Sequence, residues 1–531
     1  MSVGGVPGKR MTLGETIMLG KYDLIVIGAG NGGLMTACRA ARMGLKTLVL
    51  EKHNLPGGAA SSFVRGRFEF DSALHELPDF GAGEHRGGLG RLFDELGVQV
   101  EMLPVPDAFR YVCKRNGETL LDVTMPHGRE AVFDFIAREC PDDRDAMEKL
   151  FAAAEDMERG LAYFGSTRGN LDLEELQRNH ANFMRILSLS AGEFFDAIGM
   201  SRRCQDILSA YWPYQGADID TVDASRLILM IKGYLLNGAF IPKYRAHQLS
   251  VAIMKRAREL GAEFHFNAEV TKLLTKNGAV DGVETSDGKR YRAIAVASNA
   301  FPELIYSKLL DNKKLVPKFE LQKVNARSYS FRGFCVYLGL DASPEELGIK
   351  DYSIFITSSL DTRELYRNCA GQNAADYQLV ALCLNIANPD CSPAGTSILT
   401  LTVSFTADAW ADVTKEDYVK AKRRIADHMI SVYEEKIGVK IRGHIEEIEI
   451  CTPSTYARYM NTPQGSIYGY LSDTWDGMSS RTLAAPMEPT VPGLFFVGAH
   501  GSRLSGFLPS YMSGDQAGKQ IAGYVMGGDK P

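Results

Sequence analysis

Three glycines at a fixed spacing carry the clearest chemistry in the sequence. Gly28, Gly30 and Gly33 come directly after the apolar run 24–27, which is typical of a strand buried in a parallel sheet. A helix-forming segment, 34–43, follows them. In this setting the first glycine makes a tight turn, the second lets the backbone approach a pyrophosphate, and the third lets the helix pack against the strand. The helix start offers free N–H groups to the phosphates.

A carboxylate completes this pattern. Glu51 follows a second apolar run, 45–50, and is placed to accept hydrogen bonds from a ribose diol. The alternative is a glycine-rich loop in an ordinary α/β protein, but here strand, loop, helix, strand and acid occur in the required order. The stretch therefore predicts a dinucleotide site and leaves the identity of the dinucleotide open.

A second glycine-rich loop comes soon after the carboxylate. Gly57 and Gly58 precede Ser61 and Ser62, so a turn here would bring N–H and hydroxyl groups to phosphate or ribityl oxygens. Taken alone, the segment favours an ordinary loop. Residues 68–75 then alternate like a strand and turn.

In this order, the motifs carry a family resemblance. The GxGxxG run at 28–33, the acid at the strand end, the Gly-Gly-x-x-Ser loop at 57–61 and Phe-x-Phe-Asp at 68–71 resemble the FAD-dependent phytoene desaturase, carotene isomerase and retinol saturase group. That group lies within the amine-oxidase-like flavoprotein superfamily. The resemblance covers nearly all of residues 21–523, is strongest at both ends, and implies FAD as the cofactor.

The resemblance also implies the fold class, which is α/β. A Rossmann-type FAD-binding domain (GR2-type) would be interleaved with a substrate domain made of a mixed sheet and helices. Residues 1–20 would be a flexible N-terminus. The expected FAD-binding segments are 21–110, 240–305 and 483–531, and the expected substrate-domain segments are 111–239, a helical cap, and 306–482.

Periodicity predicts the individual elements. Helical spacing dominates 129–238, and the aromatic run 211–214 inside it favours helix-packing core over a substrate wall. Further helices are expected at 249–260 and 418–437, and strands at 263–270, 279–285, 290–297, 331–340, 379–386, 397–404 and 493–498.

By resemblance, FAD would be held along its whole length. The backbone at Val270 would meet the adenine end, and the helix beginning near Pro509 would point its N-terminus at the pyrimidine edge of the flavin. The cofactor contacts implied in this way are Gly28, Gly30, Asn31, Gly32, Gly33, Glu51, Lys52, Gly57, Gly58, Ser61, Ser62, Leu74, Val270, Gly498, His500, Phe507 and Leu508.

Two positions depart from the family pattern. Ala499 stands where the family normally has Asp or Glu, and His500 beside it is the candidate substitute. Tyr244 and Arg245 stand where the family usually has two glycines. Both departures concern the flavin half of the site.

Hydride transfer to or from flavin N5 needs proximity and orientation more than a charged catalyst. Reduction of an activated alkene also needs a proton donor, and the resemblance places His75 and Tyr511 near the flavin ring. Structural roles are the alternative for both residues. Desaturation, saturation and redox-neutral isomerisation of an apolar, isoprenoid or polyene-like substrate all stay open.

Two other functions compete with this one. Amine oxidases usually carry Arg after the Gly-Gly pair, where this chain has Ala59, which counts against that class. Some members of the same fold bind prenylated GTPases without flavin, and the departures at Ala499, Tyr244 and Arg245 leave room for such a binding module. The intact phosphate loop favours a flavoenzyme.

Composition sets further bounds on partners. A net charge of −6 over 531 residues disfavours nucleic acid, and the nine scattered cysteines without CxxC predict neither a disulfide framework nor a metal site. Only one nucleotide fingerprint is convincing, so electrons would pass to or from an external carrier or quinone. The cysteine usage and the lack of a signal peptide or long apolar span favour a cytoplasmic protein. Peripheral membrane contact is expected because an apolar substrate would be delivered from a membrane.

Overall fold

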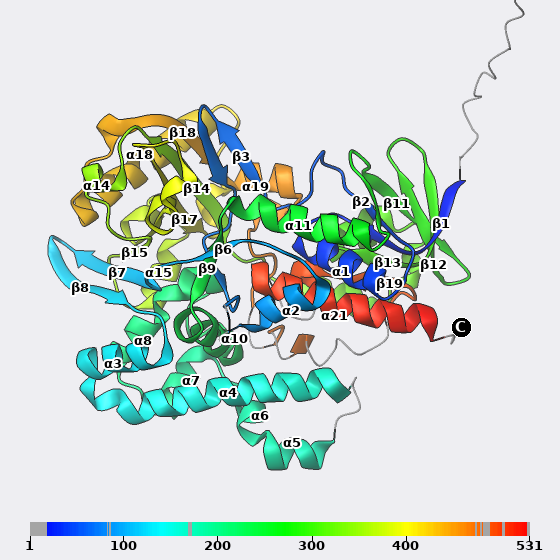
Figure 1. Ribbon diagram of the computed structural model, residues 1–531, viewed down its shortest axis with the longest axis horizontal. Helices are drawn as coiled ribbons and strands as arrows, with labels where there is room; N and C mark the ends of the chain where they lie inside the picture. Colours follow the sequence, from blue (N-terminus) through cyan, green and yellow to red (C-terminus); the bar gives the residue numbers. More distant parts are fainter. Residues whose placement is uncertain are drawn as a thin grey trace, which may run out of the picture.

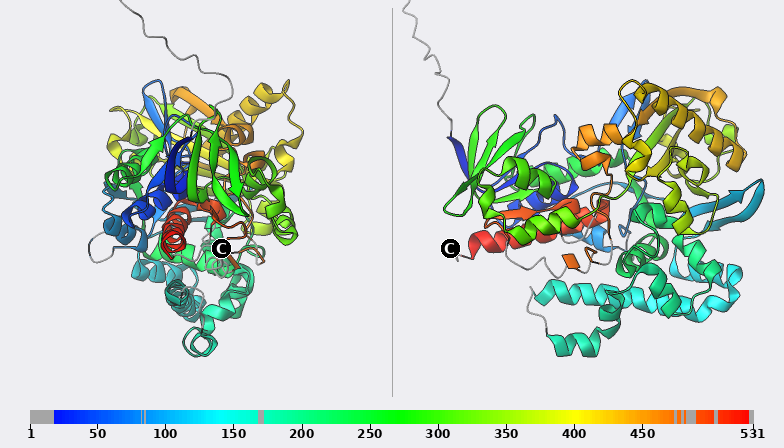
Figure 2. Two further views of the ribbon diagram at one scale, coloured as in Figure 1. Left: turned by 90° about the vertical axis from the view of Figure 1, so that its right-hand side faces the viewer. Right: turned by 180° about the vertical axis from the view of Figure 1, so that it is seen from behind.

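The computed structural model describes residues 18–81, 83, 86–167, 172–472, 475–477, 480–481, 489–501 and 505–527. Most of the expected flexible N-terminus, residues 1–17, lies outside this range. Two lobes, each built on a seven-stranded sheet, lie side by side, and a helical layer runs beneath the second lobe (Figures 1 and 2). The fold is α/β, as the sequence predicts.

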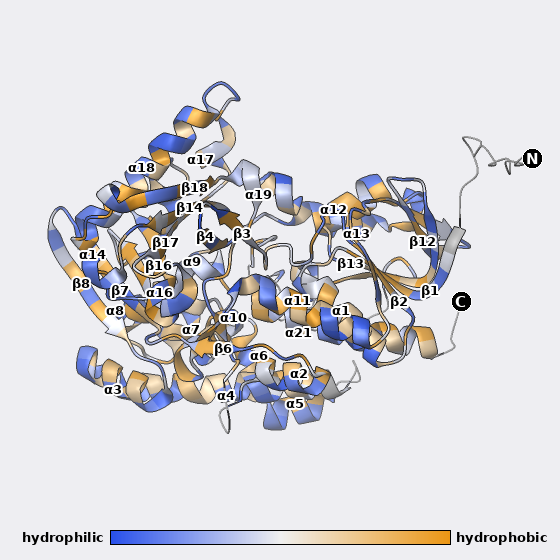
Figure 3. Cartoon of the chain, turned by 45° about the horizontal axis from the view of Figure 1, so that its top comes forward, coloured by the Kyte–Doolittle hydropathy of each residue, from blue (hydrophilic) through white to orange (hydrophobic). Residues whose placement is uncertain are grey.

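The first sheet has the order β10-β2-β1-β13-β12-β11, and β19 pairs with β13. Its parallel centre is buried, which explains the continuous apolar runs in its strands (Figure 3). Three distant chain segments contribute to it. The strands are β1 (Met18–Ile27), β2 (Thr47–Leu50), β10 (Glu263–His265), β11 (Val270–Lys276), β12 (Ala279–Thr285), β13 (Arg290–Ser298) and β19 (Leu494–Phe496).

The single strand expected at 263–270 is wrong. β10 pairs in parallel with β2, whereas β11 pairs antiparallel with β12 at another part of the sheet. The chain changes direction between them at Asn267, whose φ is 54°. Asparagine tolerates this left-handed conformation better than most residues, so the break follows from local chemistry.

Helices α1 (Asn31–Arg42), α11 (Arg245–Glu259) and α21 (Phe507–Met526) pack on this sheet, and α2 (Gly88–Leu96) packs beside α1 and α21. Helices α1 and α21 approach closely because the contact residues of α21 are small. A Cβ on Gly518 would lie 2.7 Å from Cβ of Arg39. The Arg39 guanidinium also forms a buried ion pair with Asp515.

The second sheet has the order β18-β14-β17-β16-β15-β7-β8. It is mixed, since β15 and β7 are parallel and the other neighbours antiparallel. The strand expected at 379–386 ends at Cys383, and α16 (Leu384–Ala387) follows. The strands are β7 (Phe109–Arg115), β8 (Glu118–Met125), β14 (Arg332–Leu340), β15 (Ser353–Thr357), β16 (Gln378–Cys383), β17 (Ser397–Phe405) and β18 (Ile445–Cys451).

Helices cover both sides of this second lobe. The amphipathic α18 (Tyr418–Ile437) buries its apolar face on the core of the sheet. The cap begins with α3 (Arg129–Glu139) and α4 (Arg144–Thr167) and continues to α10 (Ala224–Met230). A small sheet of β5 (Leu77–Pro78), β9 (Ala239–Pro242) and β6 (Met102–Pro104) links cap and cofactor lobe. Within the described residues, no helix is long and apolar enough to cross a bilayer.

Candidate functional site

A cavity of about 1180 Å³ runs along the junction of the two lobes. Its walls include the glycine loop after β1, the start of α21, the second sheet and the cap. Ligand pockets for one drug-sized molecule usually measure about 300–1,000 Å³. This cavity therefore has room for a cofactor together with a substrate.

The glycine loop is shaped by contacts that leave no room for side chains. Gly28 has a φ of 91°, which only glycine adopts readily. A Cβ on Gly33 would press into the Gly28 carbonyl oxygen, and one on Gly32 would press into the backbone of Gly498. The two ends of the cofactor domain thus meet at the loop that a pyrophosphate would approach.

Glu51 lies at the expected end of the cavity. Its Oε2 accepts the Ala29 N–H at 2.7 Å, its Oε1 accepts the His53 N–H at 2.9 Å, and the residue is only 7% exposed. A carboxylate offers about four lone-pair sites, so two acceptor sites stay open for a diol.

Asn299 is a cavity residue that the sequence motifs did not indicate. It follows β13, its N–H donates to the Ile27 carbonyl at 2.9 Å, and a Cβ on Gly30 would lie 2.7 Å from its Nδ2. Asn299 therefore packs against the end of β1 and against the glycine loop that follows it. The available signal was its place at the carboxyl end of a buried parallel strand, where ligands bind in such sheets.

Another part of the wall is formed around Ala499 and His500. Arg481 donates to the Ala499 carbonyl oxygen at 3.1 Å and to Asp476 at 2.7 Å, and Arg327 donates to the same carboxylate at 2.8 Å. Burial, and then the Arg481 and Arg327 charges, lower the pKa of His500 to about 3. Its imidazole is therefore neutral, and its buried Nδ1 has no partner among the described residues.

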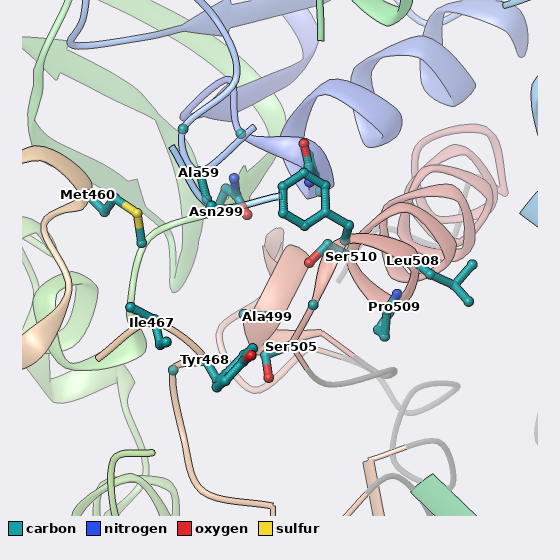
Figure 4. Close-up of a pocket in the computed structure, with 18 of the residues that line it drawn as sticks. Ala59, Asn299, Met460, Ile467, Tyr468, Ala499, Ser505, Leu508, Pro509 and Ser510 are labelled. Atoms are coloured by element: carbon teal, nitrogen blue, oxygen red, sulfur yellow. The ribbon is translucent and has the colours of Figure 1, made fainter. Parts of the chain in front are cut away.

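The N-terminus of α21 opens onto the same space. Gly506 precedes the helix with a φ of 110°, and no side chain caps the first turn among the described residues. Figure 4 shows Leu508, Pro509 and Ser510 on one side of the pocket and Met460 and Ile467 on the other. Free N–H groups at a helix start favour negative charge, as expected beside a reduced flavin.

Most of the expected cofactor contacts lie on the cavity wall. Four positions do not, namely Gly33, Ser61, Ser62 and Gly498. Those on the wall are Gly28, Gly30, Asn31, Gly32, Glu51, Lys52, Gly57, Gly58, Leu74, Val270, His500, Phe507 and Leu508.

Gly33 and Gly498 act through packing, since they support the loop from behind. The two serines differ from the expectation. Ser61 donates to the Gly58 carbonyl at 2.9 Å, and Ser62 belongs to β3 (Ser62–Arg65), where it donates to Glu69. Pairing of β3 with β4 (Phe68–Asp71) takes the hydroxyls away from the cavity.

The two expected proton donors have different surroundings. Tyr511 is fully buried in the cofactor-lobe core against Phe93, and its hydroxyl donates to Asn31. It is not among the described cavity residues, so its expected catalytic placement is not supported. His75 lines the cavity, and its Nδ1 lies 2.8 Å from the Tyr214 hydroxyl. Burial lowers the pKa of His75 to about 4, so the ring is neutral at pH 7.

The departure at Tyr244 and Arg245 does not reach the cavity. Arg245 adopts a φ of 72° and donates to the backbone carbonyls of Glu69, at 2.9 Å, and Cys391. Tyr244 is 60% exposed. Where two glycines would give a flexible turn, Arg245 thus links the two lobes by hydrogen bonds. Tyr244 and Arg245 are not among the described cavity residues.

Each of the two interpretations of the aromatic run 211–214, helix-packing core and substrate wall, holds for part of it. Tyr211 and Trp212 are buried in the core, as favoured, whereas Tyr214 lines the cavity. FAD fits three features of this site. They are the glycine loop, the open acceptor sites of Glu51, and the His500 Nδ1 that has no partner among the described residues. Bound there, Glu51 would hold the ribose, and the α21 N-terminus would face the flavin.

Comparison with known proteins agrees with this fit. The sequence model described as FAD dependent oxidoreductase matches residues 23–366, more than half of the chain. A prolycopene isomerase from Daucus carota is 24% identical over 523 residues, covering 92% of this chain and 78% of the relative. An all-trans-retinol 13,14-reductase from Danio rerio is 25% identical over 474 residues, covering 84% and 77%.

Solved structures share the fold. An oxidoreductase from Methanosarcina mazei superimposes with a TM-score of 0.62 at 16% identity, covering 93% of this chain and 99% of that one. Putrescine oxidase bound to putrescine gives a TM-score of 0.58 at 14% identity, covering 96% and 99%. At these identities the likeness extends to the fold alone.

Proposed function

Because the chain belongs to the FAD dependent oxidoreductase family, we propose that it acts on a carbon–carbon double bond of an apolar, isoprenoid or polyene-like substrate. The observation that carries this proposal is the continuity of the cavity. The space beside the cofactor cradle extends without a break between the second sheet and the cap. Its walls there are mainly apolar and aromatic, with Leu229, Tyr234, Tyr337, Leu382, Tyr456 and Ile467 among them.

The chamber, which is the part of the cavity between the second sheet and the cap, is mainly apolar. An apolar space beside a hydride-transferring cofactor suits an alkene. Reduced FAD supplies a hydride, and the protein has to exclude water and hold the reacting carbon in place. The names of the two relatives refer to isomerisation of prolycopene and reduction of retinol, which supports a polyene-like substrate for this chain. An external carrier or quinone would exchange electrons with the flavin.

Oxidation of an amine is the second candidate, supported by the fold of putrescine oxidase. The charge in the chamber favours the first candidate. Arg226 lines it, and a guanidinium repels the ammonium group of an amine substrate. Ala59 also stands where amine oxidases usually have Arg.

The test uses purified protein carrying FAD. The flavin is reduced without oxygen and mixed with a panel of apolar alkenes, and its absorbance and the products are followed. Re-oxidation with a saturated product identifies a reductase, and a geometric isomer with the flavin still reduced identifies an isomerase. Hydrogen peroxide release from simple amines, with no reaction on any alkene or saturated counterpart, would overturn the proposal.

A further inference from the structure

One carboxyl group of the cavity wall lies among aromatic rings. Glu76 is 3% exposed, and its Oε1 accepts the Tyr214 hydroxyl at 3.2 Å. Its Oε2 has no hydrogen-bond partner among the described residues. The neighbouring Tyr211 and Tyr234 rings lie 5.4 and 6.1 Å from that of Tyr214. An ionised carboxylate with a single hydrogen bond is costly in such surroundings.

The carboxyl therefore keeps its proton. Burial raises the pKa of Glu76 to about 8, so the acid is mostly neutral at pH 7. In the neutral form Oε1 is the carbonyl oxygen that accepts from Tyr214, and Oε2 carries the proton. Oε2 is covered but has no protein partner among the described residues, and because Glu76 lines the cavity, a rotation of the carboxyl can present this proton to a bound molecule.

Glu76 lines the same cavity as the start of α21 and the cap. It directly precedes β5, which packs against α21, the helix that opens toward the flavin. Its partner tyrosine is close to Gly216, where a Cβ would lie 3.6 Å from the Tyr468 ring. A Cβ on Gly469 would in turn lie 3.7 Å from Cβ of Ala499. Glu76 thus shares one cavity with Tyr468 and Ala499.

We propose that Glu76 is the proton donor in the reduction of a carbon–carbon double bond, a role that rests on the proposed function. The hydride, with its two electrons, comes from reduced FAD, which a diffusible donor of dihydronicotinamide or hydroquinone type restores. One carbon of the double bond gains that hydride, and the other gains the proton from Oε2. The π bond is lost, two C–H bonds form, and Glu76 is left as a carboxylate.

Two neighbours can return the proton. Tyr214 already donates to Oε1, and His75 Nδ1 lies 2.8 Å from the Tyr214 oxygen. A neutral imidazole can pass its Nδ1 proton to the tyrosine as the tyrosine passes its own to the carboxylate, while the imidazole Nε2 takes up a proton from water. His75 lines the same cavity, so its ring meets water there once the product has left. Tyr214 and His75 are positioning and relay residues in this scheme.

A second polar group of the chamber indicates the substrate class. The Arg226 side chain donates to the Tyr214 carbonyl at 3.3 Å and forms no ion pair with a described carboxylate. Arg226 is half-buried, and a cation that forms no ion pair can stabilise negative charge on a bound oxygen. A hydride adding to an alkene conjugated with a carbonyl places its charge on that oxygen. The chamber therefore fits an apolar α,β-unsaturated aldehyde or ketone.

The test measures a single turnover. Protein with dithionite-reduced FAD is mixed without oxygen with farnesal or retinal, and with the matching alcohols farnesol and retinol. The aldehydes should re-oxidise the flavin faster than the alcohols. Glu76→Gln should slow the aldehyde reaction by about 10²–10⁴-fold, whereas Glu155→Gln, at an exposed ion pair on the cap, should leave it unchanged.

Infrared spectroscopy gives a readout independent of turnover. At pH 7 the carbonyl stretch of a protonated carboxylic acid should be present and should disappear in Glu76→Gln. Glu76→Asp, which keeps the acid, controls for misfolding and should retain part of the rate. Active wild-type protein with a Glu76→Gln rate within twofold, or without the infrared band, overturns this inference alone. Wild-type protein inactive on every alkene overturns the proposed function.

Discussion

The Tyr511 hydroxyl donates to Asn31 Oδ1 at 3.1 Å, joining residues 480 positions apart. This bond fixes the start of α1 to α21, so it orients the phosphate-side helix against the flavin-side helix. Tyr511→Phe should lower the free energy of unfolding by about 1 kcal/mol. The single-turnover rate should stay within twofold, because the hydroxyl lies in the core. Urea unfolding and stopped-flow absorbance measure the two quantities, and a rate loss of tenfold or more would return Tyr511 to the catalytic candidates.

Glu51 should determine affinity for FAD more than rate. Glu51→Gln keeps the shape but loses the charge that strengthens hydrogen bonds to the Ala29 N–H and to a ribose diol. We expect FAD affinity to fall about 10-fold or more, equivalent to at least about 1.4 kcal/mol. Titration of the apoprotein with FAD by calorimetry measures this change. Equal affinity in variant and wild type would contradict the assignment.

Asp476 should be important for stability. It is 2% exposed and lies between Arg327 and Arg481. Asp476→Asn leaves two buried cations without their carboxylate, which costs about 3–5 kcal/mol. Asp427→Asn is the matched control, since its pair with Arg442 is exposed and worth less than about 1 kcal/mol. Similar unfolding midpoints in urea for the two variants would contradict this reading.

Stability should fall as pH rises from about 6.5 to about 8. The folded pKa of Glu76 is about 8 and its ordinary value is 4.5, so in this range the folded state holds a proton that the unfolded state has lost. Each pH unit then costs at most about 1.4 kcal/mol. His75 acts oppositely, because its folded pKa of about 4 makes stability rise with pH up to about 6.5.

Glu76→Gln should therefore flatten the stability curve between pH 6.5 and 8. The other ionisable groups near Glu76 do not titrate in this window, because they are phenols with raised pKa values and one arginine. They are Tyr211, Tyr214, Tyr234, Tyr352, Tyr468 and Arg226. Thermal unfolding across pH measures the effect. An unchanged slope in the variant would mean that Glu76 is ionised in the folded protein.

The ADP half of the site could be predicted from the sequence because its determinants are local. The turn at Gly28, the packing of Gly33 and the acid at Glu51 all lie within one strand–helix–strand unit. Asn299 and Glu76 were not predicted. The residues that they contact lie far away in the sequence, and only the fold brings them together. A motif within one stretch of chain does not indicate such contacts.

Helix phase explains why Tyr511 lies off the cavity wall. Ser510 and Met512 line the cavity, whereas Tyr511 between them points about 100° away, toward Phe93 of α2. The resemblance concerns this turn of α21, and the phase of the helix decides which of its residues face the cavity. The boundaries of the larger elements were easier, as with the helix 418–437, because long amphipathic patterns leave little choice.

The strands of the first sheet come from distant parts of the chain, and this has a consequence for biosynthesis. β1 and β2 come early in the chain, β10 to β13 come midway, and β19 with α21 comes last. Gly32 needs Gly498 behind it, and the flavin end needs the N-terminus of α21. A nascent chain that lacks residues 494–526 therefore has no complete cradle, although its phosphate loop is already made. Cofactor loading should follow synthesis of residues 494–526, and until then the apolar strands of the first sheet are incompletely covered and prone to aggregation.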